Sequence, residues 1–119
     1  MLIFALQIYI IVGLFLFLRQ RKMIYYPTEE INHSFTEQIF ENDGELIKVI
    51  VINPNQENAI IYFGGNAENV VYSSLDLKQH ASNTVYLVNY RGYGGSTGKP
   101  TEKGLYSDAL YIYDDIASN

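Results

Sequence analysis

Two glycines followed by a polar turn form the motif of this chain that best fits a reactive site. The stretch IIYFGGNAEN, residues 60–69, is an apolar run that stops at Gly64 and Gly65. Because glycine has no Cβ, the backbone there can turn sharply and approach another group closely. The backbone N–H groups of Asn66 and Ala67 can then point into a site at the end of a strand, where such dipoles stabilise charge on an acyl-transfer oxygen. The alternative is an ordinary strand-to-helix turn, which a motif this short does not exclude.

The pentapeptide GGSTG, residues 94–98, matches the G-x-S-x-G pattern of a nucleophilic serine, but its context argues against that role. A nucleophile elbow places its serine on a tight turn between a strand and a helix. Ser96 instead lies six residues beyond Tyr90, where an apolar run ends, and Lys99 and Pro100 separate it from the next helix. Both histidines precede Ser96, whereas such folds place the histidine after the serine. We therefore interpret the pentapeptide as a glycine-rich loop and expect no catalytic triad in this chain.

The sequence patterns of phosphate-binding and metal-binding sites are not matched in full. The run GYGGSTGKP has Pro100 where a phosphate loop needs Ser or Thr, and Thr97 at the last glycine position of a dinucleotide fingerprint. His33 and His80 have no neighbouring His or Cys at metal-ligand spacing. We interpret His80 as a residue that closes a helix, where the dipole favours its partial charge. The sequence therefore predicts neither a cofactor nor a metal.

Two buried strands with a helix between them must position the turn. Residues 59–63 and 84–90 are apolar runs typical of strands, and residues 69–80 predict a helix with Val71 and Leu75 on its apolar face. This order is typical of a parallel βαβ unit. The turn at Gly64 would then lie at the carboxyl end of the first of these strands.

Further elements flank this unit. Residues 35–40 and 46–52 predict a hairpin around Asp43-Gly44, a pair that tolerates positive φ. Residues 101–116 predict a helix capped by Thr101. Its apolar stripe consists of Leu105, Ala109, Ile112 and Ile116. Its carboxylates, Asp108, Asp114 and Asp115, are interpreted as a solvated face.

The first 18 residues contain no charged side chain. As a helix they extend about 27 Å, close to a hydrocarbon core of about 30 Å. A signal peptide carries its positive charge before the apolar stretch, whereas Arg19, Arg21 and Lys22 follow it here. We therefore expect a retained single-pass anchor with the C-terminal part on the cytoplasmic side. The predicted organisation is an anchor with a basic flank (1–22), a connector (23–34) and a partial α/β domain (35–119).

The charge of the chain excludes one class of partner. The net charge is −5, and without the three basic residues beside the anchor, five basic residues remain against 13 acidic ones, a net charge of −8. Such a surface does not neutralise phosphates, so nucleic acid is not expected as a partner. The chain has no cysteine, which excludes disulfides and zinc–thiolate sites.

Together the anchor, the turn IIYFGGNAEN and the run VNYRGYGGSTGKPTEKGLYSDAL resemble the N-terminal half of the α/β-hydrolase superfamily, especially its membrane-anchored, ABHD-type serine hydrolases. Family members show an H-G-N-A-x-N turn, then D-Y-R-G-Y/F-G-x-S-x-G and P-S/T-x-x-G-L. The matching positions are Gly65, Asn66, Ala67, Asn69, Tyr90, Arg91, Gly92, Tyr93, Gly94, Ser96, Gly98, Pro100, Thr101, Gly104 and Leu105. Gly64 replaces the family's His and Asn89 its Asp, so we expect a loop that is less well braced.

The resemblance implies an α/β fold class: the N-terminal half of an α/β-hydrolase fold, with a β-hairpin and then βαβα in three layers, an incomplete sheet and one preceding transmembrane helix. It also implies that the backbone N–H of Asn66, between Gly65 and Ala67, is an oxyanion-hole donor. The complete form would hydrolyse a small acyl ester, thioester or amide, with the triad outside this chain.

The family's strand order, 1-2-4-3-5, leaves the third strand of this chain with an unpaired apolar edge. We therefore expect the isolated soluble part, residues 23–119, to be poorly stable or to associate. The alternative to an enzyme is a non-catalytic, membrane-tethered remnant or interaction module, and a nucleotide-binding βαβ protein is a more distant one.

Overall fold

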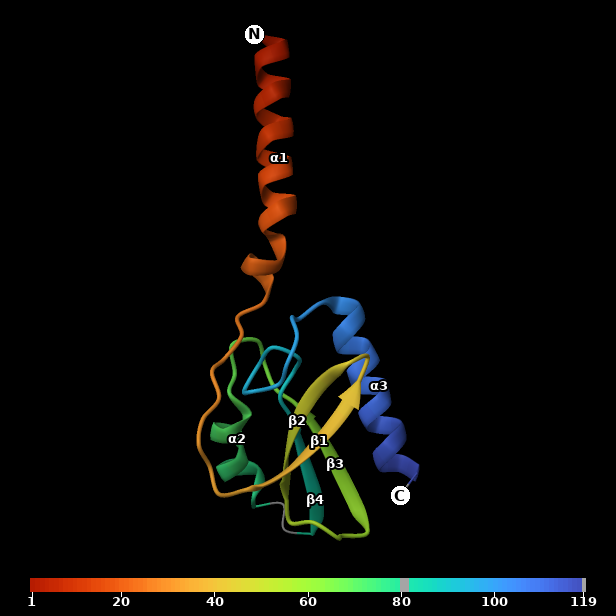
Figure 1. Ribbon diagram of the computed structural model, residues 1–119. Coiled ribbons are helices and arrows are strands. Elements are labelled where there is room, and N and C mark those ends of the chain that lie inside the picture. The colour runs from red at the N-terminus through yellow and green to blue at the C-terminus, as the bar shows by residue number, and fades with distance from the viewer. Residues whose placement is uncertain (80–81, 119) are drawn as a thin grey trace.

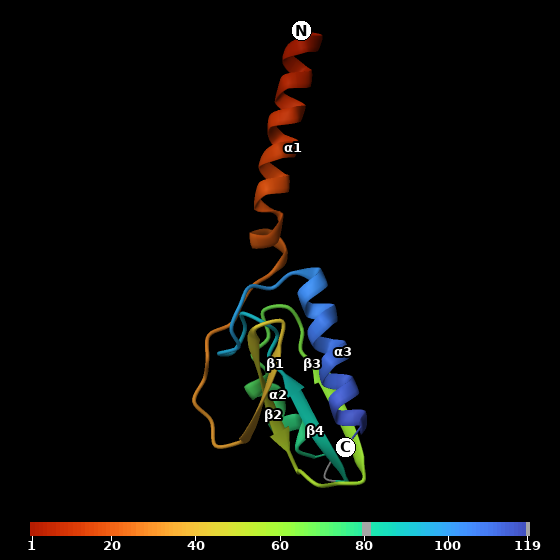
Figure 2. The same ribbon diagram turned by 45° about the vertical axis from the view of Figure 1, so that its right-hand side comes forward.

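The computed structural model describes residues 1–79 and 82–118. Its first element is a long helix, α1 (Leu2–Ile24), none of whose residues is buried. It includes an apolar window with a mean hydropathy of 2.3 and is long enough to cross a membrane. The helix stands away from the rest of the chain, which forms a layered body at its C-terminal end (Figures 1 and 2). It ends two residues beyond the predicted boundary of the anchor, where Tyr25 has an extended backbone.

The predicted hairpin is confirmed. It consists of β1 (Thr36–Asn42) and β2 (Glu45–Ile52), which pair antiparallel. Asp43 and Gly44 connect them with positive φ angles of 52° and 75°. Two consecutive positive φ angles give a turn whose twist matches that of the flanking strands, which is why this dipeptide was informative.

The predicted βαβ unit is also confirmed. It consists of β3 (Asn58–Phe63), α2 (Val70–Leu77) and β4 (Asn83–Val88), and the two strands are parallel neighbours. Because β4 also pairs antiparallel with β2, the order of the sheet is β1-β2-β4-β3. The last element is α3 (Glu102–Ser118). The carboxyl ends of β3 and β4 therefore lie side by side, and the loops that follow them meet at that rim.

Helices cover both faces of the sheet, which gives three layers. The core cluster on the α3 side consists of Phe40, Ile47, Val49, Val88 and Ile112. The core cluster on the α2 side consists of Ile50, Ile52, Val70, Val85 and Leu87. Alternate residues of β2 enter opposite clusters, as the two-residue period of a strand requires. This incomplete, three-layer α/β layout is consistent with the N-terminal half of an α/β-hydrolase fold, as the resemblance implied.

The prediction for the apolar face of α2 is confirmed for Val71, which packs against the core, and wrong for Leu75. Leu75 is 68% exposed, whereas Val70 and Ser74 are buried. The helix begins at Val70, because the side chain of Asn69 caps it by accepting a hydrogen bond from the N–H of Val71 (3.1 Å). A residue four positions after Val70 lies on the same face, so Ser74 faces the sheet and its hydroxyl donates to the carbonyl of Val71. The predicted role of His80 lies outside the described residues.

The predicted start and apolar stripe of α3 are confirmed, but one of its carboxylates is not solvated. The hydroxyl of Thr101 accepts a hydrogen bond from the N–H of Gly104 (3.0 Å), and Ile112 is buried. Asp108, however, is only 3% exposed. Its position on the helix gave no sign of this, because its partner Arg91 comes from the loop after β4.

Within the described part of the chain, β3 pairs with β4 on one side only. β1 is also an edge strand, but Glu37 and Glu41 protect it, whereas β3 (NAIIYF) carries no charge. An uncharged apolar edge is a template for pairing with another chain. We expect the chain to associate through this edge.

Adding a charge to the β3 edge tests this expectation. Ala59→Lys, at an exposed position of β3, should shift detergent-solubilised chain from oligomer to monomer in analytical ultracentrifugation. Gln38→Lys on β1 is the control and should leave the distribution unchanged. A dispersed monomer with a sharp cooperative melt in the original chain would contradict the expectation.

Candidate functional site

The turn after β3 is a closed loop. The N–H of Glu68 donates to the carbonyl of Gly65 (3.1 Å), and Ala67 has a φ of 62°, in the left-handed region. A Cβ on Gly64 would lie 2.9 Å from a methyl group of Val70. A side chain at position 64 would therefore press on Val70 at the start of α2.

The expectation of a poorly braced loop is wrong, because other groups brace it. The hydroxyl of Tyr90 donates to the carbonyl of Gly64 (2.8 Å). The side-chain oxygen of Asn66 accepts from the N–H of Tyr26 (3.1 Å) and from the hydroxyl of Tyr93 (2.9 Å), and its amide nitrogen donates to the carbonyl of Ile24. The turn is thus joined to the end of α1 and to the loop after β4.

The two amides of the turn differ in availability. The N–H of Gly65 donates to the Glu68 carboxylate (2.6 Å). For the backbone N–H of Asn66, no acceptor is recorded among the residues that the structure describes. Asn66 is exposed at the carboxyl end of β3 and lines a cavity there. The backbone N–H of Ala67 also has no acceptor among the described residues, but Ala67 lines a different cavity. Of the predicted site residues, Asn66 therefore combines an available amide with a position on this cavity.

Glu68 holds the turn in shape, a role that the sequence did not reveal. Besides the N–H of Gly65, its carboxylate accepts hydrogen bonds from the hydroxyls of Tyr62 (2.8 Å) and Ser73. Burial acts to raise the pKa of Glu68, but these donors stabilise the carboxylate, so that its pKa is lowered overall. An ionised Glu68 holds the Gly65 amide and shapes the turn. In the sequence, Glu68 cannot be distinguished from an ordinary surface carboxylate, because its donors meet it only in the folded turn.

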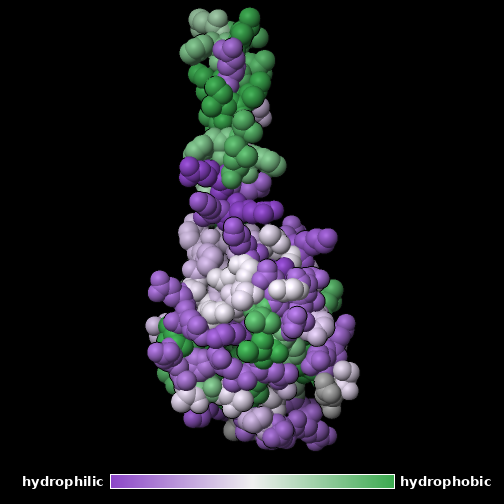
Figure 3. Space-filling view, viewed as in Figure 1, coloured by the Kyte–Doolittle hydropathy of each residue, from purple (hydrophilic) through white to green (hydrophobic). Residues whose placement is uncertain are grey.

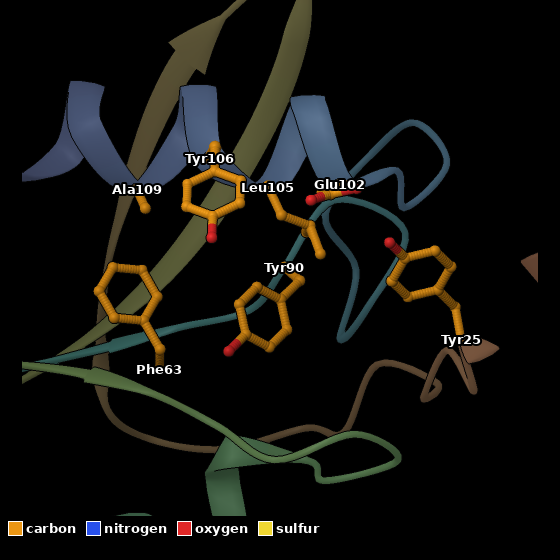
Figure 4. Close-up of a pocket in the computed structure, with 7 residues that line it drawn as sticks. All are labelled: Tyr25, Phe63, Tyr90, Glu102, Leu105, Tyr106 and Ala109. Carbon is orange, nitrogen blue, oxygen red and sulfur yellow. The ribbon is translucent and has the colours of Figure 1, made fainter.

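Two cavities adjoin the turn, with volumes of about 220 Å³ and 280 Å³. Both are lined by Tyr25, Tyr90 and Leu105, and the larger extends to Phe63 and Tyr106. Figure 4 shows how these side chains converge from the end of α1, from β3, from the end of β4 and from α3. Phe63 and Tyr90 stack with ring centroids 6.3 Å apart. Burial raises the pKa of Tyr90, so its hydroxyl stays neutral. Apart from Glu102 in the larger cavity, the walls are mostly aromatic and aliphatic and suit an apolar ligand.

Ser96 occupies a structural position. It is 8% exposed, its hydroxyl donates to the carbonyl of Asn89 (2.8 Å), and it accepts from the N–H of Lys48 (2.9 Å). His33, the one histidine among the described residues, contacts Glu37 on β1 instead (3.1 Å). Ser96 therefore joins the glycine-rich loop to β2.

The structural role of Ser96 predicts a loss of stability on substitution. Ser96→Ala leaves the buried N–H of Lys48 and the carbonyl of Asn89 without this partner, which should cost about 1–3 kcal/mol. Denaturant unfolding followed by circular dichroism measures this cost. Ser34→Ala, at an exposed position of the connector, is the control. A cost equal to that of the control would contradict the structural role.

The glycine-rich loop is also held to α3. Arg91 donates two hydrogen bonds to the Asp108 carboxylate, from Nε (2.7 Å) and Nη2 (2.6 Å). This bidentate contact raises the pKa of Arg91. The side-chain amide of Asn42 donates to the same carboxylate (2.9 Å). Asp108 thus joins the loop, the helix and the hairpin turn, and holds Tyr90 and Tyr93 in place at the rim.

No group of three His, Cys, Asp or Glu side chains suited to a metal ion is present in residues 1–79 and 82–118. The available chemistry is therefore that of the Asn66 amide and the aromatic cavities. These features can hold an apolar group and donate a hydrogen bond to an oxygen beside it.

Comparison with known proteins shows partial similarity. No family model matches the chain. It is 46% identical over 59 residues to human ABHD12B, over 46% of this chain and 16% of that protein. It is 36% identical over 59 residues to human alpha/beta hydrolase domain-containing protein 17B, over 47% of this chain and 20% of that protein. It is 37% identical over 70 residues to the uncharacterized membrane protein YNL320W of Saccharomyces cerevisiae, over 56% of this chain and 25% of that protein. The chain thus spans a quarter or less of these relatives.

Proposed function

We propose that this chain forms the oxyanion-binding part of a membrane-anchored serine hydrolase. It resembles the N-terminal half of an ABHD-type α/β-hydrolase in sequence and in fold. In the complete form this enzyme cleaves acyl esters, thioesters or amides. The nucleophile, the acid and the base come from residues outside this chain. The observation that carries the proposal is the available N–H of Asn66 beside an aromatic cavity at the carboxyl end of β3.

The chemistry follows from this arrangement. Attack on an acyl carbon places negative charge on the former carbonyl oxygen, and an N–H held toward that position stabilises it. The Asn66 side chain, bonded to Tyr93 and to the end of α1, prevents the turn from rotating. An apolar acyl group fits the neighbouring cavity. Removal of one such donor typically costs about a hundred- to a thousandfold in kcat.

We further propose that α1 anchors the enzyme in a membrane with the α/β part on the cytoplasmic side. Arg19, Arg21 and Lys22 follow the apolar segment, and an excess of positive charge is retained on the cytoplasmic side. A relative named as a membrane protein supports the anchor.

Covalent labelling of serine tests the proposed enzyme. A fluorophosphonate probe should label a product of the reading frame that continues past Asn119, at a serine in a strand–turn–helix G-x-S-x-G context, and should leave the 119-residue chain unlabelled. Heat-denatured protein is the control. Labelling of the 119-residue chain that Ser96→Ala abolishes would overturn the assignment of Ser96. A frame that continues without such a serine would favour a non-catalytic, membrane-tethered module.

A further inference from the structure

Positive charge gathers at one end of an otherwise acidic molecule. Of the eight Lys and Arg residues, five lie either in the last turns of α1 or in the segment that leads into α3 and begins it. We call these five residues the basic collar: Arg19, Arg21, Lys22, Lys99 and Lys103. The others are placed differently: Lys48 pairs with Glu30, Arg91 pairs with Asp108, and Lys78 ends α2.

The fold, and not the sequence, brings the two parts of the collar together. A cavity of about 420 Å³ is lined by Arg21 and Tyr25 on one side and by Thr101, Glu102 and Lys103 on the other. Figures 1 and 2 both show the start of α3 below the end of α1 and to one side of it, with the loop before α3 running between them. Figure 3 shows a hydrophilic band where the apolar helix meets the body of the molecule. Glu102 is the acidic residue that shares this cavity.

The orientation of the α/β part relative to α1 is determined by hydrogen bonds rather than left to a free linker. The N–H of Tyr26 donates to the hydroxyl of Tyr93 (3.0 Å) as well as to Asn66. Two residues further on, the carbonyl of Thr28 accepts from the N–H of Gly94 (2.9 Å). The carbonyl of Glu29 then accepts from the Asn69 side chain (2.7 Å). The connector therefore runs along the loops at the carboxyl rim of the sheet and holds that rim under α1.

We propose that the basic collar binds the phosphate-bearing headgroups of an anionic leaflet, so that the carboxyl rim of the sheet rests on the membrane surface. This rests on the proposed anchoring of α1, which would place the collar at headgroup depth. Clusters of Lys and Arg next to a membrane-spanning helix are attracted to anionic lipid. Lys99 and Lys103 extend this attraction to the folded part of the chain. Tyr25 and Tyr26, at the same level, suit the interface.

Binding of the collar to headgroups would also place the cavities beside Asn66 next to the membrane. Tyr25 and Leu105 line both cavities beside Asn66, and the cavity at the collar also includes Tyr25. With the collar on the headgroups, these cavities open beside the lipid surface. A ligand then reaches Asn66 from the membrane side.

Site-specific labelling tests the proposal, because the chain has no cysteine of its own. Three single-cysteine variants carry a bimane label: Phe17→Cys in α1, Tyr106→Cys near the start of α3, and Ser118→Cys at its end. The two α3 positions are both exposed and lie about 18 Å apart along the helix. Each full-length variant is reconstituted in nanodiscs of phosphatidylcholine with or without 30% phosphatidylserine. Nitroxide carried on the lipid headgroup or on the acyl chain quenches the label.

In nanodiscs with phosphatidylserine, headgroup nitroxide should quench Tyr106→Cys at least threefold more than Ser118→Cys. The double substitution Lys99→Glu/Lys103→Glu and 0.5 M salt should each reduce this difference, because both weaken the attraction of exposed charges to the headgroups, whereas the hydrogen-bonded connector retains the remainder. Lys78→Glu is a single charge reversal away from the collar and should have no effect. Equal quenching at the two positions, or a difference that the double substitution leaves unchanged, would overturn the proposal.

Quenching of Phe17→Cys by acyl-chain nitroxide reports the anchor separately. If acyl-chain nitroxide does not quench this label, the anchoring on which the proposal rests is wrong. If it quenches this label but quenching at the two α3 positions is equal, only the proposed headgroup binding of the collar is wrong. None of these readouts requires a nucleophile. The outcome is therefore independent of fluorophosphonate labelling.

Discussion

The Asp108→Asn variant is expected to unfold with a free energy about 3 kcal/mol lower than that of the original chain, the lower end of the range for breaking a buried ion pair. The substitution preserves the shape of the side chain but removes its charge. Arg91 keeps its own charge, and its side chain is only 11% exposed, so water replaces little of the lost interaction. Denaturant unfolding in detergent, followed by circular dichroism, measures the change.

Two further variants show whether the pair acts through its charge. Asp114→Asn removes an exposed carboxylate from the same helix and should change stability by less than about 0.5 kcal/mol. Arg91→Met/Asp108→Leu replaces both partners with apolar side chains and should recover much of the loss. If Asp108→Asn cost no more than Asp114→Asn, the pair would not be what holds the glycine-rich loop to α3.

Gly94→Ala is expected to destabilise the chain by about 2–5 kcal/mol, the sum of left-handed backbone strain and overpacking. Gly94 has a φ of 50°, and a Cβ there would lie 2.0 Å from the side-chain oxygen of Asn89. Asn89 is only 3% exposed. The N–H of Gly94 also bonds to the carbonyl of Thr28 in the connector, so a glutamate-specific protease should cleave the connector at Glu29 or Glu30 faster in this variant.

Gly44→Ala is the matched control. Gly44 also has a positive φ, 75°, but nothing lies within 4 Å of a Cβ at that position. It should show the backbone strain alone, about 1–2 kcal/mol. Gly94→Ala combined with Asn89→Ala should recover part of the difference. Equal losses for Gly94→Ala and Gly44→Ala would show that Asn89 does not restrict the loop.

Some motifs in the sequence predicted the structure correctly, and others were misleading. The G-x-S-x-G match at Ser96 is a loop anchored by the backbone of β2 and by Asn89, and the order of the predicted elements was enough to exclude a nucleophile elbow. The departure at Gly64 suggested a loose turn. The structure shows instead that Tyr90 and Asn66 brace it, which no local pattern could indicate.

Local sequence patterns were enough to predict the elements: the apolar helix, the hairpin at Asp43-Gly44, the βαβ unit and the amphipathic α3. These follow from backbone periodicity, turn geometry and capping, which depend on residues a few positions apart. The pairing of polar groups, in contrast, depends on the folded chain. Arg91 and Asp108 are 17 residues apart, and Tyr26 and Tyr93 are 67 apart. Such contacts depend on where loops close over the sheet, so a buried carboxylate such as Asp108 and an exposed one such as Asp114 look alike until the chain has folded.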